Sequence, residues 1–307
     1  MKTYSQSLQL MGNNFTISVV AEQEAFAQIN IERAIAEIRR IEQLFTTYND
    51  DSQTNRINKN AGIAPVTVDQ EVFDLIERSI RISKITQGAF DISYGSIDAS
   101  LWNFDKTMTA LPSKEEAKKR VHLINYKNII LDKSNYSVFL KEKGMRIGFG
   151  GIGKGYAAER AKKILIENKV ISGIINASGD LTTWGKQPNG KQWTIGIANP
   201  DQPTAAFSFI EISDKAVATS GNYEKFILID GKKYSHTIDP KTGLPIRGIK
   251  SVTIICNNAE LADAMTTPIA IMGIQAGLYL VNQLPELYCI IIDDNNKIYT
   301  SKNINLQ

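Results

Sequence analysis

Strand-like runs follow one another without helices between them through much of the second half of the chain, and this order most constrains the fold. Apolar residues that alternate or run together, with many β-branched side chains, are typical of strands. Five such runs are VISGIINASGD (170–180), QWTIGIANP (192–200), AFSFIEI (206–212), KFILIDGKKYSH (225–236) and KSVTIICN (250–257). Because strands and helices do not alternate strictly, an α+β fold is favoured over a doubly wound sheet. We expect a mixed, largely antiparallel sheet with flanking helices.

Helical patterns surround these strands. In residues 24–45 the apolar positions recur at helical spacing and are Phe26, Ile29, Ile35, Ile38, Ile41 and Phe45. Further helices are expected from a cap at Asp69 to a stop at Gly88, from a capping box at Ser113 and Glu116, over 155–169, and from a cap at Asn258 to Met272.

The other segments predict short strands in one continuous domain. Residues 8–21 suggest a strand pair or one bent strand, and 128–132, 136–144 and 145–149 suggest a three-stranded meander. No linker-like segment and no internal repeat divides the chain, so we predict a single domain over residues 1–307.

Composition narrows the class of protein. The net charge of +3 over 307 residues, with no long basic run, argues against a nucleic-acid binder. No stretch approaches the roughly 20 apolar residues that span a bilayer, and the first ten residues lack the apolar core of a signal peptide. We expect a cytoplasmic protein from the sequence as it stands, or an exported one whose leader has been removed.

Cys256 and Cys289 lie in apolar runs without metal-ligand spacing, which predicts buried free thiols.

A glycine-rich turn leads into the predicted helix at 155–169. The segment MRIGFGGIGKGYAAERA satisfies both G-x-G-x-x-G, at Gly148, Gly150 and Gly153, and G-x-x-x-x-G-K, ending at Lys154. Both patterns are typical of phosphate binding at a helix N-terminus. Each fails in detail, because Gly155 replaces the Ser or Thr of a phosphate loop and the preceding segment looks antiparallel. A tight backbone turn with a lysine suits a pyrophosphate; packing of a helix start against a sheet is the other interpretation.

Two more segments carry candidate chemistry. Asp263 and Thr267 are four residues apart and share one face of a predicted helix; a carboxylate and a hydroxyl suit Mg²⁺, although such pairs are more often caps or surface groups. Pro268 follows and removes one helical hydrogen bond. His236 stands in YSHTIDPKTGLPI between turn signals, and a loop histidine with a structural hydrogen bond is the alternative to a catalytic one.

Taken together, these stretches resemble the ApbE family of FAD:protein FMN transferases. The resemblance runs nearly end to end through LMGNNF, LFTTYNDDSQTNRIN, GAFDIS, LWNF, GGIGKGYAAERA, IINASGDL, WTIGIANP, VATSGNYEKF, YSHTIDPKTGLPI and SVTIICNNAELADAMTT. It implies an ApbE or T-fold-like architecture. It also implies FAD as donor, Mg²⁺ as the ion, and FMN joined by a phosphoester to Ser or Thr of a target flavoprotein, with AMP leaving.

The resemblance also implies site residues. The magnesium ligands would be Asp263, Thr267 and the backbone carbonyl of Gly151. The residues that would line the FAD site are Met11, Tyr48, Ala89, Phe90, Asp91, Gly148, Lys154, Thr219 and His236. Gly148 stands where the family usually has aspartate, which removes one carboxylate beside the flavin nucleotide. Ile92 stands where proline is common, and Pro268 where alanine is common.

The negative charge of the FAD diphosphate indicates the role expected of each site residue. A hydroxyl that attacks an anionic diphosphate needs that charge offset, which Mg²⁺ and Lys154 would do. His236 is the expected proton acceptor, oriented by Asp239. An Mg²⁺-dependent FAD pyrophosphatase and a non-catalytic FAD-binding protein are the alternatives. Tyr48 favours transfer, because a ring stacked on the flavin nucleotide would limit access of water.

Overall fold

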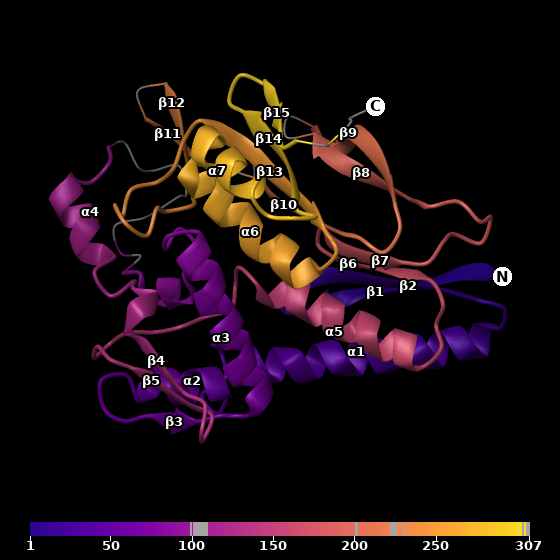
Figure 1. Cartoon of the computed structure of the whole chain (residues 1–307), viewed down its shortest axis with the longest axis horizontal. Helices are drawn as coiled ribbons and strands as arrows, with labels where there is room; N and C mark the ends of the chain where they lie inside the picture. The colour runs from indigo at the N-terminus through magenta and orange to yellow at the C-terminus, as the bar shows by residue number, and fades with distance from the viewer. Residues whose placement is uncertain are drawn as a thin grey trace.

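An eight-stranded antiparallel sheet forms the centre of the molecule (Figure 1). The computed structural model describes residues 1–98, 100, 110–199, 202–221, 226–229, 231–302 and 304. The strands, in spatial order, are β1 (Lys2–Leu10), β2 (Asn13–Ala21), β6 (Gly173–Ala177), β7 (Asp180–Trp184), β10 (Ala216–Gly221), β13 (Ile249–Cys256), β14 (Tyr288–Asp293) and β15 (Ile298–Thr300). Every neighbouring pair is antiparallel. The predicted α+β class is therefore confirmed.

The two faces of this sheet pack against different partners. Helices α1 (Glu24–Phe45), α5 (Gly153–Glu167) and α6 (Ala259–Met272) cover one face, with α7 (Ile274–Val281) beside α6 (Figure 1). The hairpin of β8 (Trp193–Asn199) and β9 (Gln202–Ile212) covers the other. Successive residues of a strand point to opposite faces; accordingly Ala216 and Ala218 join the helical core, whereas Val217 joins the cluster under the hairpin.

A smaller unit precedes the glycine-rich turn. It contains α2 (Gln53–Lys59), α3 (Gln70–Ile85) and a three-stranded sheet in the order β3 (Val66–Thr67), β5 (Ser137–Leu140) and β4 (Ile129–Asp132). Two short 3₁₀ helices, Ile92–Ser96 and Tyr126–Asn128, lie nearby in the sequence, and α4 (Lys114–Arg120) lies between them. Residues of this unit share one apolar core with the large sheet.

The third strand of the predicted meander is wrong. Met145, Ile147 and Phe149 are buried in alternation, as a strand would require, but the Asn58 side chain takes the place of a neighbouring strand. Its carboxamide accepts from the Ile147 N–H (2.7 Å) and donates to the Ile147 carbonyl (3.0 Å). A buried amide side chain thus satisfies the backbone where sheet pairing was expected.

The long helix α1 has the predicted bounds, but two of its predicted core residues are exposed. Phe26 and Ile29 face solvent, whereas Ile31, Ile35 and Ile38 are fully buried. At 3.6 residues per turn, the buried positions form one stripe, with Phe26 beside it and Ile29 on the opposite side of the helix. Ala27, which is fully buried, continues the stripe into the first turn of α1 in place of Phe26.

The predicted helix ends are largely confirmed. Ser113 and Glu116 form the expected capping box, and the Asn258 side chain accepts from the Leu261 N–H at 3.0 Å. Asp69 occupies the N-cap of α3, but its carboxylate makes no capping bond; it accepts from Gln53 Nε2 at 2.6 Å instead. Gly88, at φ +81°, donates its N–H to the Ser83 carbonyl just past the end of α3.

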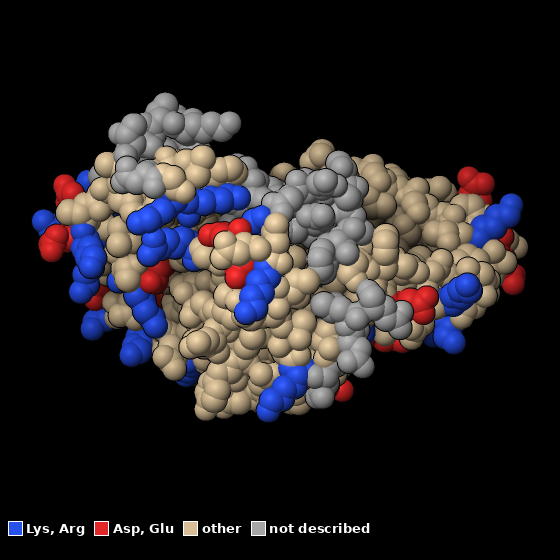
Figure 2. All heavy atoms as spheres, turned by 90° about the horizontal axis from the view of Figure 1, so that it is seen from above, with Lys and Arg blue, Asp and Glu red and all other residues tan. Residues whose placement is uncertain are grey.

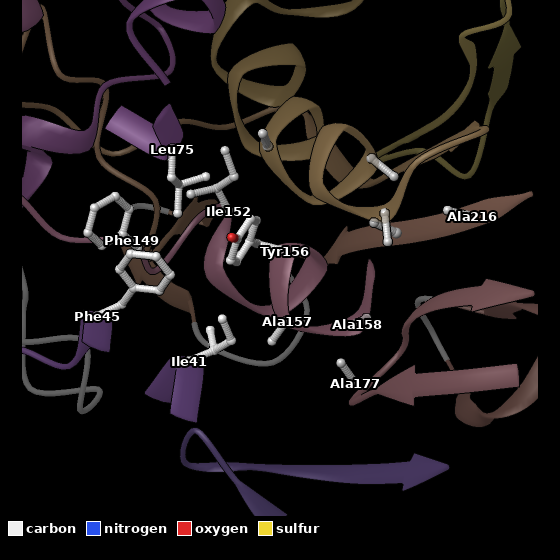
Figure 3. Close-up of a cluster of buried hydrophobic side chains, with 14 of the residues drawn as sticks. Ile41, Phe45, Leu75, Phe149, Ile152, Tyr156, Ala157, Ala158, Ala177 and Ala216 are labelled. Atoms are coloured by element: carbon white, nitrogen blue, oxygen red, sulfur yellow. The ribbon is translucent and has the colours of Figure 1, made fainter. Parts of the chain in front are cut away.

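Buried aromatic and aliphatic side chains anchor the glycine-rich turn on both flanks (Figure 3). Phe149 and Ile152 are buried on either side of Gly150 and Gly151, and the Phe149 ring lies 4.7 Å from that of Phe45 on α1. Phe149 and Ile152 therefore hold the turn that enters α5, while Gly150 and Gly151 between them are exposed.

Both cysteines are free and buried, as predicted. No helix in the described ranges is long and apolar enough to cross a membrane. On the face shown in Figure 2, acidic and basic side chains are interspersed toward both ends. The motif LWNF, residues 222–225 of the motif VATSGNYEKF, and residue 230 lie outside the described residues. The strands β11 (Phe226–Ile229) and β12 (Lys232–Ser235) pair in an antiparallel manner.

Candidate active site

Four segments that are far apart in the sequence enclose one cavity of about 420 Å³. They are the loop and 3₁₀ turn after α3, the glycine-rich turn before α5, the hairpin after β12, and the second half of α6. Seven predicted site residues line it: Ala89, Phe90, Asp91, Gly148, Gly151, His236 and Thr267. Sequence reasoning did not assign five other lining residues: Tyr94, Gly95, Thr237, Ile238 and Ile271.

Asp91 organises one wall of the cavity. Its buried carboxylate accepts from the Ser93 N–H (2.8 Å), from the Ser93 hydroxyl (2.6 Å) and from the Tyr126 N–H (2.7 Å). Burial raises the pKa of Asp91, and these hydrogen bonds oppose that rise. Asp91 therefore lies at the predicted flavin site while holding together the loop that carries Ala89 and Phe90.

The histidine hairpin is held by its own turn. The Asp239 carboxylate accepts from the Lys241 N–H (2.8 Å) and from the Thr242 hydroxyl (3.1 Å). Backbone bonds between Thr237 and Ile246 and between Asp239 and Leu244 close the hairpin below His236. The turns at Asp239 and Gly243 thus fix this loop, as its sequence suggested.

Helix α4 supports the same turn from outside. Gly243 has φ +71°, and a Cβ added there would lie 2.1 Å from the Ala117 carbonyl oxygen of α4. Ala117 and Val121 pack with Ile238 in a separate apolar cluster. Only glycine permits this approach, so the Thr242-Gly243 signal corresponds to a contact between α4 and the histidine hairpin.

Helix α6 brings Asp263 and Thr267 to the same side of the site. Asp263 is 5% exposed and lies one turn before Thr267, which lines the cavity. The helix continues through Pro268 to Met272, the end that the sequence predicted. Proline has no N–H, and the Ala264 carbonyl therefore cannot receive the usual helical bond from position 268.

Lys154, in the first turn of α5, lies between two buried carboxylates. Its Nζ donates to Asp180 and lies 3.3 Å from Asp263. Asp263 also accepts from the Gly155 N–H (3.0 Å), and Asp180 from the Thr219 N–H (3.2 Å). Sequence reasoning missed Asp180; its one local signal was the polar SGD turn that ends β6.

The charged groups of this cluster shift one another's pKa values. Burial raises the pKa of Asp180 to about 6, the negative charge of Asp263 adds to the rise, and Lys154 opposes it. Burial alone would lower the pKa of Lys154, but the two carboxylates outweigh burial and raise it. Lys154 therefore stays protonated.

The remaining predicted residues lie around the cavity or behind it. The Met11 methyl carbon would lie 3.5 Å from a Cβ added at Gly153, which places Met11 against the glycine-rich turn. The Thr219 hydroxyl pairs with that of Thr253 at 2.9 Å. The Tyr48 side chain is fully exposed, at 99%. Met11 and Thr219 thus contact parts of the site without lining its cavity.

The donors present fit a magnesium ion better than a transition metal. No cluster of three or more His, Cys, Asp or Glu side chains suited to a metal occurs among the described residues. Asp263, the Thr267 hydroxyl and the Gly151 carbonyl offer oxygen donors only. Mg²⁺ is commonly held by one or two carboxylates together with substrate phosphates. The two carboxylates also outnumber the single ammonium of Lys154, which leaves negative charge for a cation.

Comparison with known proteins gives consistent matches. A family model described as the ApbE family matches residues 11–291. An FAD:protein FMN transferase of Klebsiella pneumoniae is 32% identical over 302 residues, covering 98% of this chain and 92% of the relative. Another, of Vibrio cholerae, is 28% identical, covering 95% of this chain and 89% of the relative. The crystal structure of an ApbE protein from Thermotoga maritima superposes with a TM-score of 0.86 at 31% identity, covering 98% and 97% of the two chains.

Proposed function

Because this chain belongs to the ApbE family, we infer that it is an FAD:protein FMN transferase, which moves the FMN part of FAD to a target protein. We propose further that the acceptor is a Ser or Thr hydroxyl of a flavoprotein. The observation that supports FMN transfer at this site is the meeting of Phe90, Gly151, His236 and Thr267 around one cavity. The segments implied by the family resemblance thus converge in space.

The reaction balances as a single displacement. The acceptor hydroxyl oxygen attacks the phosphorus on the FMN side of the diphosphate. The bond from that phosphorus to the bridging oxygen breaks, and AMP leaves with the bridging oxygen. The hydroxyl proton passes to a base, and the product is an FMN phosphoester of the acceptor side chain.

Groups of this chain take named roles in that step. His236, on the cavity wall, accepts the hydroxyl proton. Asp239 shapes the turn beneath His236 and, through it, the direction of the imidazole. Lys154 offsets negative charge on the diphosphate. In the glycine-rich turn the N–H groups of Gly148, Ile152 and Gly153 already donate to backbone carbonyls, which leaves those of Gly150 and Gly151 for phosphate oxygens.

A magnesium ion would be held by Asp263, Thr267 and the Gly151 carbonyl. When bound, it would neutralise charge on the diphosphate and on the leaving phosphate. Asp263 is prepared for this role, because its carboxylate is buried and oriented by the Gly155 N–H. Met11, Ala89, Phe90, Asp91, Gly148 and Thr219 complete the proposed FAD site. The cytoplasmic location expected from the sequence stays a prediction.

The test is a mass measurement on an acceptor. The full chain is incubated with FAD, Mg²⁺ and a flavoprotein domain that carries a candidate Ser or Thr. A mass gain of FMN less one water, on that residue, is expected, together with one AMP per modified chain. If AMP forms at the same rate without the acceptor and no mass gain appears, the chain is a pyrophosphatase. FAD bound without AMP release would instead indicate a storage protein.

A further inference from the structure

Asp180, at the start of β7, contacts the lysine of the proposed site but has no role in the function described so far. We propose that Asp180 is a positioning residue: it shares Lys154 with Asp263, so that Asp263 keeps negative charge for a divalent cation. This inference rests on the proposed function, because it assumes a cation at Asp263.

The geometry of Asp180 is that of a held counter-ion. The residue is 6% exposed, and its two carboxylate oxygens have separate partners. One accepts from Lys154 Nζ, and the other accepts from the Thr219 N–H of β10 at 3.2 Å. Because β7 pairs with β10 in the central sheet, Asp180 is attached to a rigid element.

Lys154 is closer to Asp180 than to Asp263. The contact with Asp180 is the shorter of its two ion pairs, and that with Asp263 measures 3.3 Å. Asp263 is bound in addition by the Gly155 N–H. Lys154 is therefore only a partial partner of Asp263, and Asp180 is its principal one.

The net charge of the cluster explains how Asp180 would affect cation binding at Asp263. Two carboxylates and one ammonium leave one net negative charge at the cluster. Without Asp180, Lys154 would have Asp263 as its single carboxylate partner within the cluster, and the pair would be neutral. A buried carboxylate that is fully paired with an ammonium attracts a cation weakly, because the ammonium has to be displaced first.

The test measures cation binding rather than FMN transfer. Mn²⁺ is the probe, and free Mn²⁺ is followed by electron paramagnetic resonance with the full chain, both with and without FAD. Asp180→Asn is expected to raise the Mn²⁺ dissociation constant about tenfold, within the range of coupling measured between contacting charged groups. Lys154→Met is expected to lower that constant when FAD is absent, since the competing ammonium is gone.

The double variant of Asp180→Asn and Lys154→Met separates a positioning role of Asp180 from a direct effect of its own charge on the cation. If Asp180 acts through Lys154, Asp180→Asn has little further effect in the Lys154→Met background. An equal loss in both backgrounds would overturn the proposal, because Asp180 would then act by its own charge alone. Failure of the wild type to bind Mn²⁺ under either condition would also overturn it.

A matched control tests for a purely structural role. Asp293 is a buried aspartate of the same sheet, 8% exposed, whose carboxylate accepts from the Asn295 and Lys297 N–H groups. Asp293→Asn is expected to lower the melting temperature and to leave Mn²⁺ binding unchanged. If it weakens Mn²⁺ binding as much as Asp180→Asn does, the effect is structural and the proposal fails. Absence of FMN transfer by a wild type that binds Mn²⁺ would instead count against the proposed function.

Discussion

The Gly155 N–H lies 3.0 Å from a carboxylate oxygen of Asp263 and joins α5 to α6 at the proposed metal site. A Cβ added at Gly155 would lie 2.1 Å from the Ala259 carbonyl oxygen and 2.8 Å from the Asp263 Cβ. The two helices approach this closely because position 155 has no side chain. The same glycine that breaks the phosphate-loop pattern therefore places the carboxylate.

Gly155→Ala is expected to force α5 and α6 apart. Overpacking of this kind typically costs about 1–3 kcal/mol, so thermal unfolding should shift to lower temperature and FMN transfer should fall with the displacement of Asp263. Gly150→Ala, in the same turn, is the control for stability, since a Cβ there meets no atom within 4 Å. Equal melting temperatures for the two variants would contradict the packing argument.

His236→Ala is expected to lower the rate of FMN transfer at least about 10²-fold, as loss of a general base does. FAD affinity should change much less, because several other groups line the cavity. Single-turnover transfer and FAD titration measure the two effects. His122→Ala is the control: this exposed histidine contacts the Lys119 carbonyl in the last turn of α4 and lies outside the cavity lining. Near wild-type transfer by His236→Ala would exclude His236 as the base.

Local signals in the sequence predicted much of the fold. The Asn258 cap, the Ser113 box and the bounds of α1 all depend on residues within a few positions of one another, and the structure has each of them. The glycine-rich turn was likewise recognisable from its own residues and those of the helix that follows. Such features follow from short-range hydrogen bonding and periodicity.

Contacts between distant segments were not predictable in the same way. Asp180 meets Lys154 only because β7 pairs with β10 and α5 crosses the sheet beside them. The segment at 145–149 lacks its strand because Asn58, almost 90 positions earlier, satisfies its backbone. Phe26 and Ile29 were assigned to the core stripe of α1 from their apolar character, but helical spacing puts them beside and opposite the stripe, and both are exposed.

Tyr48→Ala is expected to change FAD binding and water access without changing the fold, because the ring is almost fully exposed. Loss of stacking should raise the FAD dissociation constant up to about tenfold. It should also raise AMP release in the absence of acceptor relative to FMN transfer, as water gains access. Tyr48→Phe keeps the ring and should behave as wild type. An unchanged ratio of AMP release to transfer in Tyr48→Ala would remove Tyr48 from the site.

The two buried thiols predict a dependence on alkaline pH. Burial raises the pKa of Cys256 to about 11 and that of Cys289 to about 12, whereas an unfolded thiol ionises near about 8.5. Between these values the unfolded chain binds fewer protons than the folded one, so the free energy of unfolding falls as pH rises. Replacing both by serine should flatten this part of the stability curve, measured by denaturant unfolding from pH 8 to 10.

Alkylation gives an independent check on the same thiols. At pH 8 the native chain is expected to react with iodoacetamide at least about a hundredfold more slowly than the unfolded chain, because the thiolate is the reactive form. Mass spectrometry of native and denatured samples measures the two rates. Rapid labelling of the native chain at either cysteine would contradict its burial.

Thr267→Val removes the hydroxyl from the cavity wall and keeps the volume of the side chain, so it tests the proposed magnesium site. The Mg²⁺ concentration needed for half-maximal transfer is expected to rise about tenfold, as expected for the loss of one hydrogen-bonding or ligating oxygen to a charged partner. Thr267→Ser keeps the hydroxyl and should need little more Mg²⁺ than wild type. Chelation of divalent ions should abolish transfer by all three proteins, with recovery on adding Mg²⁺. Transfer that persists in chelator would show that Lys154 and the glycine-rich turn neutralise the diphosphate without an ion.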